Sequence, residues 1–478
     1  MSMVEARNPF TGETIFSAPS ETYESLALQL AAMRSAARAW ATLPPAQRAD
    51  HVEQALQYFR AHRDDIAQAV TREVGKPLAE AAGEVDFMLE RAEYMCRFAR
   101  DGALKPVDLS AYQSDDFQGR IDFVAKGVVY VITPWNYPLF CAINGVVCAL
   151  LGGSSVLLKH TSAPSVGRHF AQAFGSLAGI GPLLVNTVVD FDQSARIIEE
   201  GDIDHVVFTG SVHGGTVIQA SLARRAANTR LRRPFIGSSL ELGSSDATYI
   251  AADADLDHSV EWAVRIGRLH NSGQSCCAVK RVFVHESLHA AFIEKAIQVM
   301  QAQCQGDPLR PDTTLGPLYG GHAAVDRLKD MVDAAVAQGA SVLAGGSVTT
   351  VGQARFIAPT LLGNVPEDAA VLREETFGPV LPVVSVRSDE EAIARINDSD
   401  YGLTASIFTR SRSRAERFIR DMESGTVYVN RCNFVDARLG WIGHKGSGNG
   451  SISLSPLGLQ AICNLRSVNI DPTWLTED

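Results

Sequence analysis

Several features are scarce in this chain of 478 residues, and each scarcity excludes a class of protein. Eight cysteines are too few for a disulfide framework, and the ordinary composition excludes disorder, collagen and coiled coil. Lysine and arginine (43) are outnumbered by aspartate and glutamate (54), so a general nucleic-acid-binding protein is not expected. The N-terminus has no basic segment followed by an apolar one, so we expect a cytoplasmic protein without a signal peptide.

One run without any charged residue, from Gly127 to Leu158, is long enough to span a bilayer. Pro134, Pro138 and Gly152 are among the residues that interrupt it. We therefore interpret it as a strand, a turn, a buried helix, a second turn and a buried strand, and expect no membrane contact.

Residues 20–100 have the apolar spacing of helices, and short apolar strands then alternate with helices. The first series has strand candidates at 121–132, 154–158, 183–189, 204–208 and 247–251, and helices at 139–151, 165–178, 193–200 and 212–228. The second has strands at 281–285, 357–362, 380–386, 403–408 and 426–429, and helices at 287–303, 322–338, 389–397 and 412–421. This alternation predicts two α/β domains with parallel sheets, and sites at the carboxyl ends of the strands or between the domains.

Polar residues follow several of these strands. Asn136 lies between two prolines in TPWNYP, where a rigid loop could aim its amide at a reacting oxygen or could be a plain turn. Lys159 ends the next strand and could reach a phosphate or a ribose hydroxyl, or be solvated. Gly210 and Ser211 lie where a following helix would bind an anion through its backbone amides.

Three later motifs carry reactive groups. Glu241 in ELG could be a desolvated general base or a surface carboxylate. Cys276 in NSGQSCC could be an activated thiol in a polar turn or a buried structural cysteine. Glu375 in EETFGP could bind ribose hydroxyls or lie in a solvated turn.

Two patterns point elsewhere. His285 and His289 fit the H-E-x-x-H zinc motif, but His285 ends a predicted strand and no third ligand is evident, so no metal is expected. The arginines at 224–233 could be a phosphate or nucleic-acid patch, yet a solvated helix end or subunit contact suits the acidic chain better.

Taken together and in this order, NPFTGE, TPWNYP, VLLKH, FTGS, ELG, NSGQSC, EETFGP and HKGSGNG resemble the aldehyde dehydrogenase superfamily from residue 8 to about 450. The resemblance implies a Rossmann-like cofactor domain (1–102 and 126–243), a second α/β catalytic domain (244–442) and a small β oligomerisation element (103–125 and 455–475). It also implies NAD or NADP as cofactor, a small-molecule aldehyde as substrate, and a homodimer or homotetramer.

The resemblance assigns roles to individual residues. Cys276 is the implied nucleophile, Asn136 the oxyanion donor, and Glu241 the base that activates water to hydrolyse the acyl-thioester. The implied cofactor contacts are Ile132, Thr133, Pro134, Trp135, Lys159, Ser162, Gly210, Ser211, Leu242, Gly243, Glu375 and Phe377. The implied substrate contacts are Tyr137, Phe140, Ser275, Cys277 and Phe434, a mixture that suggests a medium-sized, partly apolar or aromatic aldehyde. Arg438 could meet a substrate carboxylate or be a surface arginine.

Several positions depart from the family pattern. Ser244 stands where a second glycine usually follows ELG, and Ser162 replaces a glutamate that disfavours a 2′-phosphate. Asp190 and Asp192 could oppose that phosphate, so the choice between NAD and NADP stays open. Two alternatives remain: a catalytically inactive binding protein with this fold, and an enzyme that passes the acyl group to CoA.

Overall fold

Four helices precede the first large sheet in this computed structural model, which describes residues 2–475. They are α1 (Tyr23–Trp40), α2 (Pro45–Ala61), α3 (Arg63–Val74) and α4 (Leu78–Arg100). Thr22 caps α1 by accepting the Ser25 N–H, and Gly75 ends α3 with a φ of 80°. The apolar residues of α2, α3 and α4 belong to one buried cluster with residues of β4 and β5, whereas Leu26, Leu30 and Met33 of α1 belong to a second cluster with other residues of these strands.

The first sheet has five parallel strands in the order β6-β5-β4-β7-β8. The strands are β4 (Val128–Ile132), β5 (Ser155–Lys159), β6 (Leu184–Thr187), β7 (His205–Thr209) and β8 (Gly237–Glu241). The chain runs outward from β4 to β6 and then returns to β7 on the other side of β4. This reversal opens a crevice at the carboxyl ends of β4 and β7, where doubly wound sheets bind ligands.

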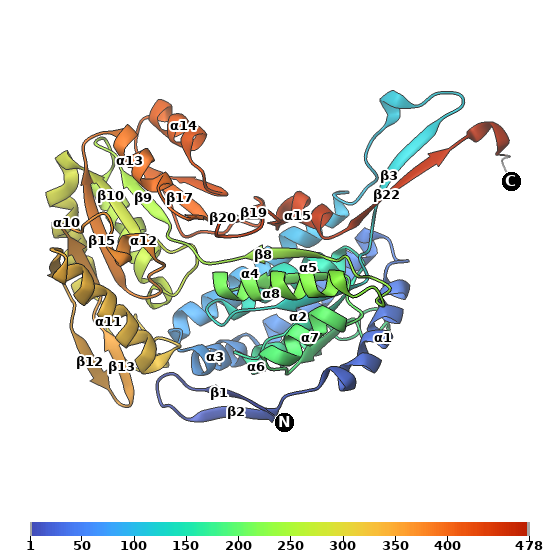
Figure 1. Cartoon of the computed structure of the whole chain (residues 1–478), viewed down its shortest axis with the longest axis horizontal. Coiled ribbons are helices and arrows are strands. Elements are labelled where there is room, and N and C mark those ends of the chain that lie inside the picture. The colour runs from blue at the N-terminus through green and yellow to red at the C-terminus, as the bar shows by residue number, and fades with distance from the viewer. Residues whose placement is uncertain (1, 476–478) are drawn as a thin grey trace.

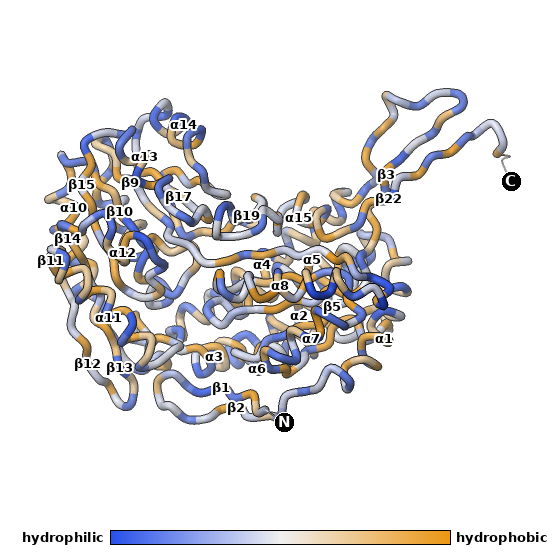
Figure 2. The backbone as a smooth tube through the Cα atoms, in the orientation of Figure 1, coloured by the Kyte–Doolittle hydropathy of each residue, from blue (hydrophilic) through white to orange (hydrophobic). Residues whose placement is uncertain are grey.

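Helices cover this sheet, as the alternating pattern predicts. They are α5 (Pro138–Leu151), α6 (Pro164–Phe174), α7 (Phe191–Glu200) and α8 (Val212–Ala227). All residues of β4 and β5 are buried, which explains their continuous apolar sequences. Figure 2 shows hydrophobic residues along α5, whose side chains are mostly buried beside the first sheet.

The second sheet has seven strands in the order β11-β14-β15-β10-β9-β17-β18, and only β11 is antiparallel to its neighbour. They are β9 (Ala247–Ile250), β10 (Arg281–His285), β11 (Ser341–Ala344), β14 (Thr360–Gly363), β15 (Val380–Val386), β17 (Thr404–Phe408) and β18 (Thr426–Val429). Its helices are α9 (Leu256–Val260), α10 (Glu286–Gln301), α11 (Gly321–Ala337), α12 (Ala370–Arg373), α13 (Asp389–Asn397) and α14 (Arg412–Asp421), with a π-helix at Glu261–Leu269. The α/β class with parallel sheets is confirmed, whereas the domain boundaries stay a prediction.

Small antiparallel pairs complete the fold. β3 (Gln118–Val124) pairs with β22 (Asn464–Ile470) in a ribbon that projects from the first lobe (Figure 1), and α15 (Ser455–Ala461) leads into it. The remaining pairs are β1 (Met3–Arg7) with β2 (Thr14–Pro19), β12 (Val348–Val351) with β13 (Ala354–Ile357), β16 (Tyr401–Gly402) with β20 (His444–Lys445), and β19 (Trp441–Ile442) with β21 (Ile452–Ser453).

The run 247–251, predicted as the last strand of the first series, is wrong in place, because it forms β9 of the second sheet. Two other predicted strands are wrong in extent. The run 121–132 is split into β3 and β4, because Gly127 has a φ of 124° and turns the chain between them. The run 357–362 is divided between β13 and β14, which belong to different sheets. Strand β8 is absent from the predicted runs because GSSLE has little apolar periodicity.

The uncharged run from Gly127 to Leu158 forms β4, α5 and most of β5, as interpreted from its breakers. Among residues 2–475, no helix is long and apolar enough to cross a membrane.

The arginine cluster is built into the packing of α8. Arg225 is 1% exposed and donates to the carbonyl oxygens of Ile198, Gly201 and Arg233, each at 2.9 Å. Its neighbour Arg224 pairs with Glu199 at 2.6 Å on the surface. The buried arginine therefore joins the end of α8 to the turn after α7.

We predict that Arg225→Ala destabilises the protein by about 3 kcal/mol, because buried carbonyl groups lose their donors. Arg224→Ala is the matched control and should cost under about 1 kcal/mol, since surface ion pairs are weak. Urea unfolding of both variants measures the difference. Equal destabilisation by the two substitutions would contradict this account of Arg225.

Candidate active site

The residues expected to act chemically lie between the two sheets. Asn136 is in the loop from β4 to α5, Glu241 is the last residue of β8, and Cys276 precedes β10. Cys276 and Glu241 line one cavity of about 320 Å³, and Asn136 contacts the loop that carries the cysteine. Residues that are far apart in the sequence are therefore brought together where strands end.

A tight turn presents Cys276. Asn271 and Ser272 just before it have φ angles of 53° and 54°, in the left-handed region. The Asn271 side chain stabilises this turn by donating to the Asn136 carbonyl oxygen at 2.9 Å and to the Gln274 carbonyl oxygen at 3.1 Å. The hydrogen bonds offset the backbone strain and join the thiol loop to the Asn136 loop.

Asn136 is buried and its amide is directed toward the same loop. Its Nδ2 donates one hydrogen to the Gln274 carbonyl oxygen at 3.2 Å, and the second amide hydrogen has no partner among residues 2–475. The Cys276 backbone N–H is likewise free of any partner within the described chain. Two donors are thus available near the thiol, as an oxyanion requires.

Behind the thiol lies a buried ammonium that sequence reasoning missed. Lys280 is 0% exposed and donates to Ser244 Oγ at 2.8 Å, to the Ser275 carbonyl oxygen at 2.9 Å and to the Cys276 carbonyl oxygen. Ser244, the departure from the family pattern, also donates its hydroxyl to the Cys276 carbonyl oxygen. Lysine and serine together hold the peptide group of the cysteine.

The two adjacent cysteines differ in their surroundings. A hydrogen bond with Cys277 and burial raise the pKa of the Cys276 thiol, and the charge of Lys280 acts in the opposite direction. Cys277 is buried and its Sγ donates to Asn433 Oδ1 at 3.1 Å. Cys276 is half-buried, and this difference fits the motif register that selected it as the reactive residue.

Glu241 is a carboxylate held in an apolar setting. Burial raises its pKa to about 7, although a hydrogen bond from Ser453, the charge of Arg91 and a hydrogen bond from Trp441 act in the opposite direction. Ser453 Oγ donates to Glu241 Oε1 from strand β21, and Trp441 lines the cavity from β19. A carboxylate with a pKa near neutrality is poised to take a proton from water.

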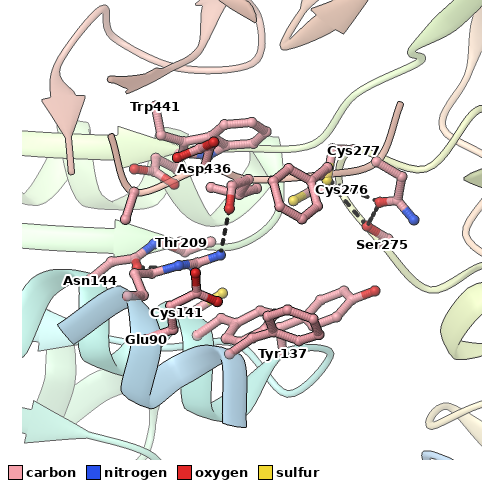
Figure 3. A pocket seen from close by; sticks show the side chains of 18 of the residues that line it. Glu90, Tyr137, Cys141, Asn144, Thr209, Ser275, Cys276, Cys277, Asp436 and Trp441 are labelled. Atoms are coloured by element: carbon pink, nitrogen blue, oxygen red, sulfur yellow. Dashed lines mark hydrogen bonds between the residues drawn. The ribbon is translucent and has the colours of Figure 1, made fainter. Parts of the chain in front are cut away.

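The residues expected to contact the substrate all line the same cavity. These are Tyr137, Phe140, Ser275, Cys277 and Phe434. Tyr137 and Phe140 stack with ring centroids 5.6 Å apart, and Tyr137 Oη bonds His270 Nδ1 at 2.8 Å. Figure 3 shows Cys276, Cys277 and Ser275 on one side of the cavity and Glu90, Asn144 and Cys141 on the other.

Arg438 is not a free cation for a substrate. It lines the mouth of the cavity but pairs with Asp436, Nη2 to Oδ2 at 2.6 Å and Nε to Oδ1 at 2.9 Å. Of the two interpretations of Arg438, the geometry favours a surface arginine paired with Asp436.

The carboxyl edge of the five-stranded sheet holds most of the expected cofactor residues. Ile132 and Lys159 end β4 and β5, and Gly210 and Ser211 follow β7. The backbone N–H and Oγ1 of Thr133 both lie 3.2 Å from the Lys159 carbonyl oxygen. Pro134 and Trp135 continue from Thr133, Ser162 follows β5, and Leu242 and Gly243 follow β8.

This edge fits a dinucleotide. Ser211 caps α8 by accepting the Gly214 N–H, so the start of this helix can hold a phosphate. Burial lowers the pKa of Lys159 to about 8, while Asp190 acts in the opposite direction. The lysine is a donor suited to a ribose hydroxyl, which an adenosine cofactor would present.

The second sheet contributes residues from the loop before β15. Glu375 Oε1 accepts the Ser244 N–H at 3.0 Å, and a Cβ on Gly243 would come within 2.5 Å of Glu375 Oε2. Phe377 packs edge-to-face on Trp135 with centroids 5.6 Å apart, and Trp135 stacks on Tyr319. Glycine at 243 is therefore required for the close approach of the carboxylate.

The H-E-x-x-H pattern serves as a helix cap. His285 Nδ1 accepts the Ser287 N–H at the start of α10. Within residues 2–475, no three histidine, cysteine or acidic side chains are grouped to hold a metal ion.

Comparison with protein families shows to which family the chain belongs. The model of the aldehyde dehydrogenase family matches residues 2–468. The chain belongs to the aldehyde dehydrogenase family. It is an NAD(P)-dependent enzyme that oxidises an aldehyde group.

Individual relatives match this aldehyde dehydrogenase along almost its whole length. The succinate semialdehyde dehydrogenase (NAD(P)+) of Escherichia coli (strain K12) is 34% identical over 467 residues, 96% of each chain. The chloroplastic betaine aldehyde dehydrogenase of Beta vulgaris is 31% identical, with 97% of this chain and 92% of that one covered. The structure of succinic semialdehyde dehydrogenase from Streptococcus pyogenes with NADP+ has a TM-score of 0.89 and 28% identity, covering 98% of this chain and all 100% of that chain.

Proposed function

We propose that this aldehyde dehydrogenase forms a thioester on Cys276 and releases the carboxylic acid by hydrolysis, with Glu241 as the base. The observation that carries the proposal is the meeting of Cys276 and Glu241 in one cavity, with the Asn136 amide beside the same loop. A thiol, an oxyanion donor and a base of suitable pKa are what this reaction needs.

In the first half-reaction, the Cys276 thiol first gives its proton to solvent, because its pKa is raised. The thiolate then attacks the aldehyde carbon and the carbonyl electrons move onto oxygen. The second amide hydrogen of Asn136 and the Cys276 N–H stabilise this oxyanion of the thiohemiacetal. When bound, NAD or NADP would supply the acceptor for the hydride that leaves this carbon. Lys159, Glu375 and the start of α8 would hold the cofactor, and Phe377 and Trp135 would lie at its reactive end.

In the second half-reaction, Glu241 removes a proton from a water molecule as the oxygen of that water attacks the thioester. The carbon–sulfur bond breaks, the acid leaves, and Cys276 returns to its thiolate form. Ser453 and the apolar walls hold the carboxylate with a pKa near 7, so that it is a competent base and a substantial share of it is ionised near neutral pH.

Two alternatives predict different outcomes of the same assay. A binding protein without catalysis would take up NAD or NADP but reduce neither with any aldehyde. A CoA-acylating enzyme would turn over only when CoA replaces water as the acceptor. The presence of Glu241 in the cavity favours hydrolysis over both.

We predict that Cys276→Ala lowers kcat for aldehyde oxidation by about 10³-fold or more, because no other group forms the thioester. Cys304→Ala removes an exposed thiol and is the matched control, with activity unchanged.

Glu241→Gln should still release one equivalent of reduced cofactor in a burst, with steady turnover slowed about 10²-fold. The absorbance of the reduced nicotinamide measures all three variants, and full steady turnover of Cys276→Ala or Glu241→Gln would refute the roles.

We predict that the hydrolytic step speeds up as the pH rises through about 7, because only ionised Glu241 accepts a proton. Ser453→Ala removes a donor to the ionised form, so the rising limb should move up by roughly one pH unit. Ser451→Ala is the control, because the Ser451 hydroxyl donates to the Ser238 carbonyl oxygen instead. A pH profile of steady turnover that is identical in wild type and Ser453→Ala would contradict the contact's role.

Assembly into a homodimer or homotetramer is part of the proposal. The β3–β22 ribbon is a two-stranded sheet that exposes Leu465 (65% exposed), and Trp474 in the short turn of helix after β22 is 86% exposed. A two-stranded ribbon is marginally stable alone, so a second chain that covers it would stabilise it. All eight cysteines are free thiols, which suits the reducing cytoplasm, and the cytoplasmic location of the protein stays a prediction.

We predict that sedimentation finds particles of two or four chains of 51.4 kDa each. Leu465→Arg should shift them toward monomers, because it places a charge where apolar contact is expected. Arg466→Ala changes the next residue of β22 and is the control, because it should leave the size of the particles unchanged if only the apolar contact of Leu465 matters. A wild-type protein that sediments as a monomer at micromolar concentration would overturn this part of the proposal.

A further inference from the structure

The cavity that holds the thiol also contains a buried cation with no use in the proposed chemistry. Arg91 lies on α4, is 6% exposed and lines the cavity. Its Nη1 donates to Asn144 Oδ1 at 3.1 Å, its Nη2 donates to the Val435 carbonyl oxygen at 3.2 Å, and its guanidinium carbon lies 4.3 Å from the centre of the Phe140 ring. All of these partners are neutral.

No acidic side chain among residues 2–475 forms an ion pair with Arg91. An arginine has five N–H donors, and these contacts use two of them. Burial lowers the pKa of Arg91, partly opposed by Cys141, Cys277, Glu84 and Glu241. A buried charge without a counter-charge is costly, so an anion that enters the cavity would be strongly favoured.

The carboxylates near Arg91 are committed to other groups. Glu84 pairs with Lys76 and accepts the Leu139 N–H at 2.9 Å. Glu241 accepts from Ser453, and Asp436 at the mouth pairs with Arg438. The position opposite Arg91 is therefore open to a ligand rather than to a side chain of this chain.

We propose that the preferred substrate is an aldehyde with a carboxylate at its other end, and that Arg91 binds this carboxylate. This inference rests on the proposed function, because it assumes that the aldehyde carbon meets Cys276. Asn144, which Arg91 contacts, lies across the cavity from Cys276 (Figure 3), so the two ends of one small molecule can reach both groups. The volume of about 320 Å³ suits a short chain between the two ends.

A carboxylate fits this site better than a phosphate. Glu90 and Asp436 line the same cavity and would repel a doubly charged group, whereas one guanidinium balances a single charge. Carboxylate and guanidinium also match in geometry, with two parallel N–H donors facing two oxygens. The neutral walls formed by Tyr137, Phe140 and Phe434 suit the methylene groups between the two ends.

The test compares 4-oxobutanoate with butanal, two aldehydes that differ in the terminal carboxylate. Wild-type enzyme should have a higher kcat/KM for 4-oxobutanoate, and Arg91→Gln should lower this preference by at least about 30-fold, mainly through KM. Arg91→Lys keeps the charge without the planar fork and should recover part of it. Arg438→Gln is the matched control, and its ratio for the two aldehydes should stay that of the wild type.

A measurement on the unmodified enzyme guards against a folding defect in the variants. Butanedioate should compete with butanal at concentrations at least about 30-fold lower than butanoate, since only its second carboxylate reaches Arg91. Equal inhibition by both acids, or an equal loss of activity toward both aldehydes in Arg91→Gln, would overturn the inference and leave a purely structural role. Failure of the wild type to oxidise any aldehyde would instead refute the proposed function.

Discussion

The buried ammonium of Lys280 joins the loop that carries Cys276 to the segment that follows the first sheet. It holds the peptide group of Cys276 from the second lobe and the hydroxyl of Ser244, which follows the last strand of the first sheet. It also lies 3.5 Å from Glu375 Oε1, which accepts the Ser244 N–H. One charge thus links the thiol loop, the end of the first sheet and a residue expected to bind ribose, and its own burial is compensated by this carboxylate and by backbone oxygens.

The alternation of apolar strands and helices was sufficient to predict two α/β units with parallel strands, but it missed β8 and placed β9 in the first series. The loops after β4 and β5 were also predictable, because Asn136 and Lys159 lie at the ends of buried runs that must stop at the sheet edge. The role of Cys276 needed the family resemblance, since a cysteine in a polar turn is equally consistent with a structural thiol. The residue-by-residue assignments stay predictions that the geometry supports.

Other features could not be predicted from local patterns. Lys280 reads as an ordinary charged residue before a strand, and Arg91 stands among acidic neighbours on α4 that suggest a solvent-facing turn of helix. Ser453 lies 212 positions from Glu241 in the sequence, and nothing near it marks it as a partner. In each case the meaning of the residue arises from a contact between distant segments, which only the packed chain creates.

Strand β21, which carries Ser453, continues through α15 directly into β22. The hydroxyl that donates to Glu241 is therefore attached, within a dozen or so residues of continuous chain, to the ribbon that projects from the body of the molecule. The proposed contact between chains and the acidity of Glu241 would therefore be linked through one short stretch of backbone.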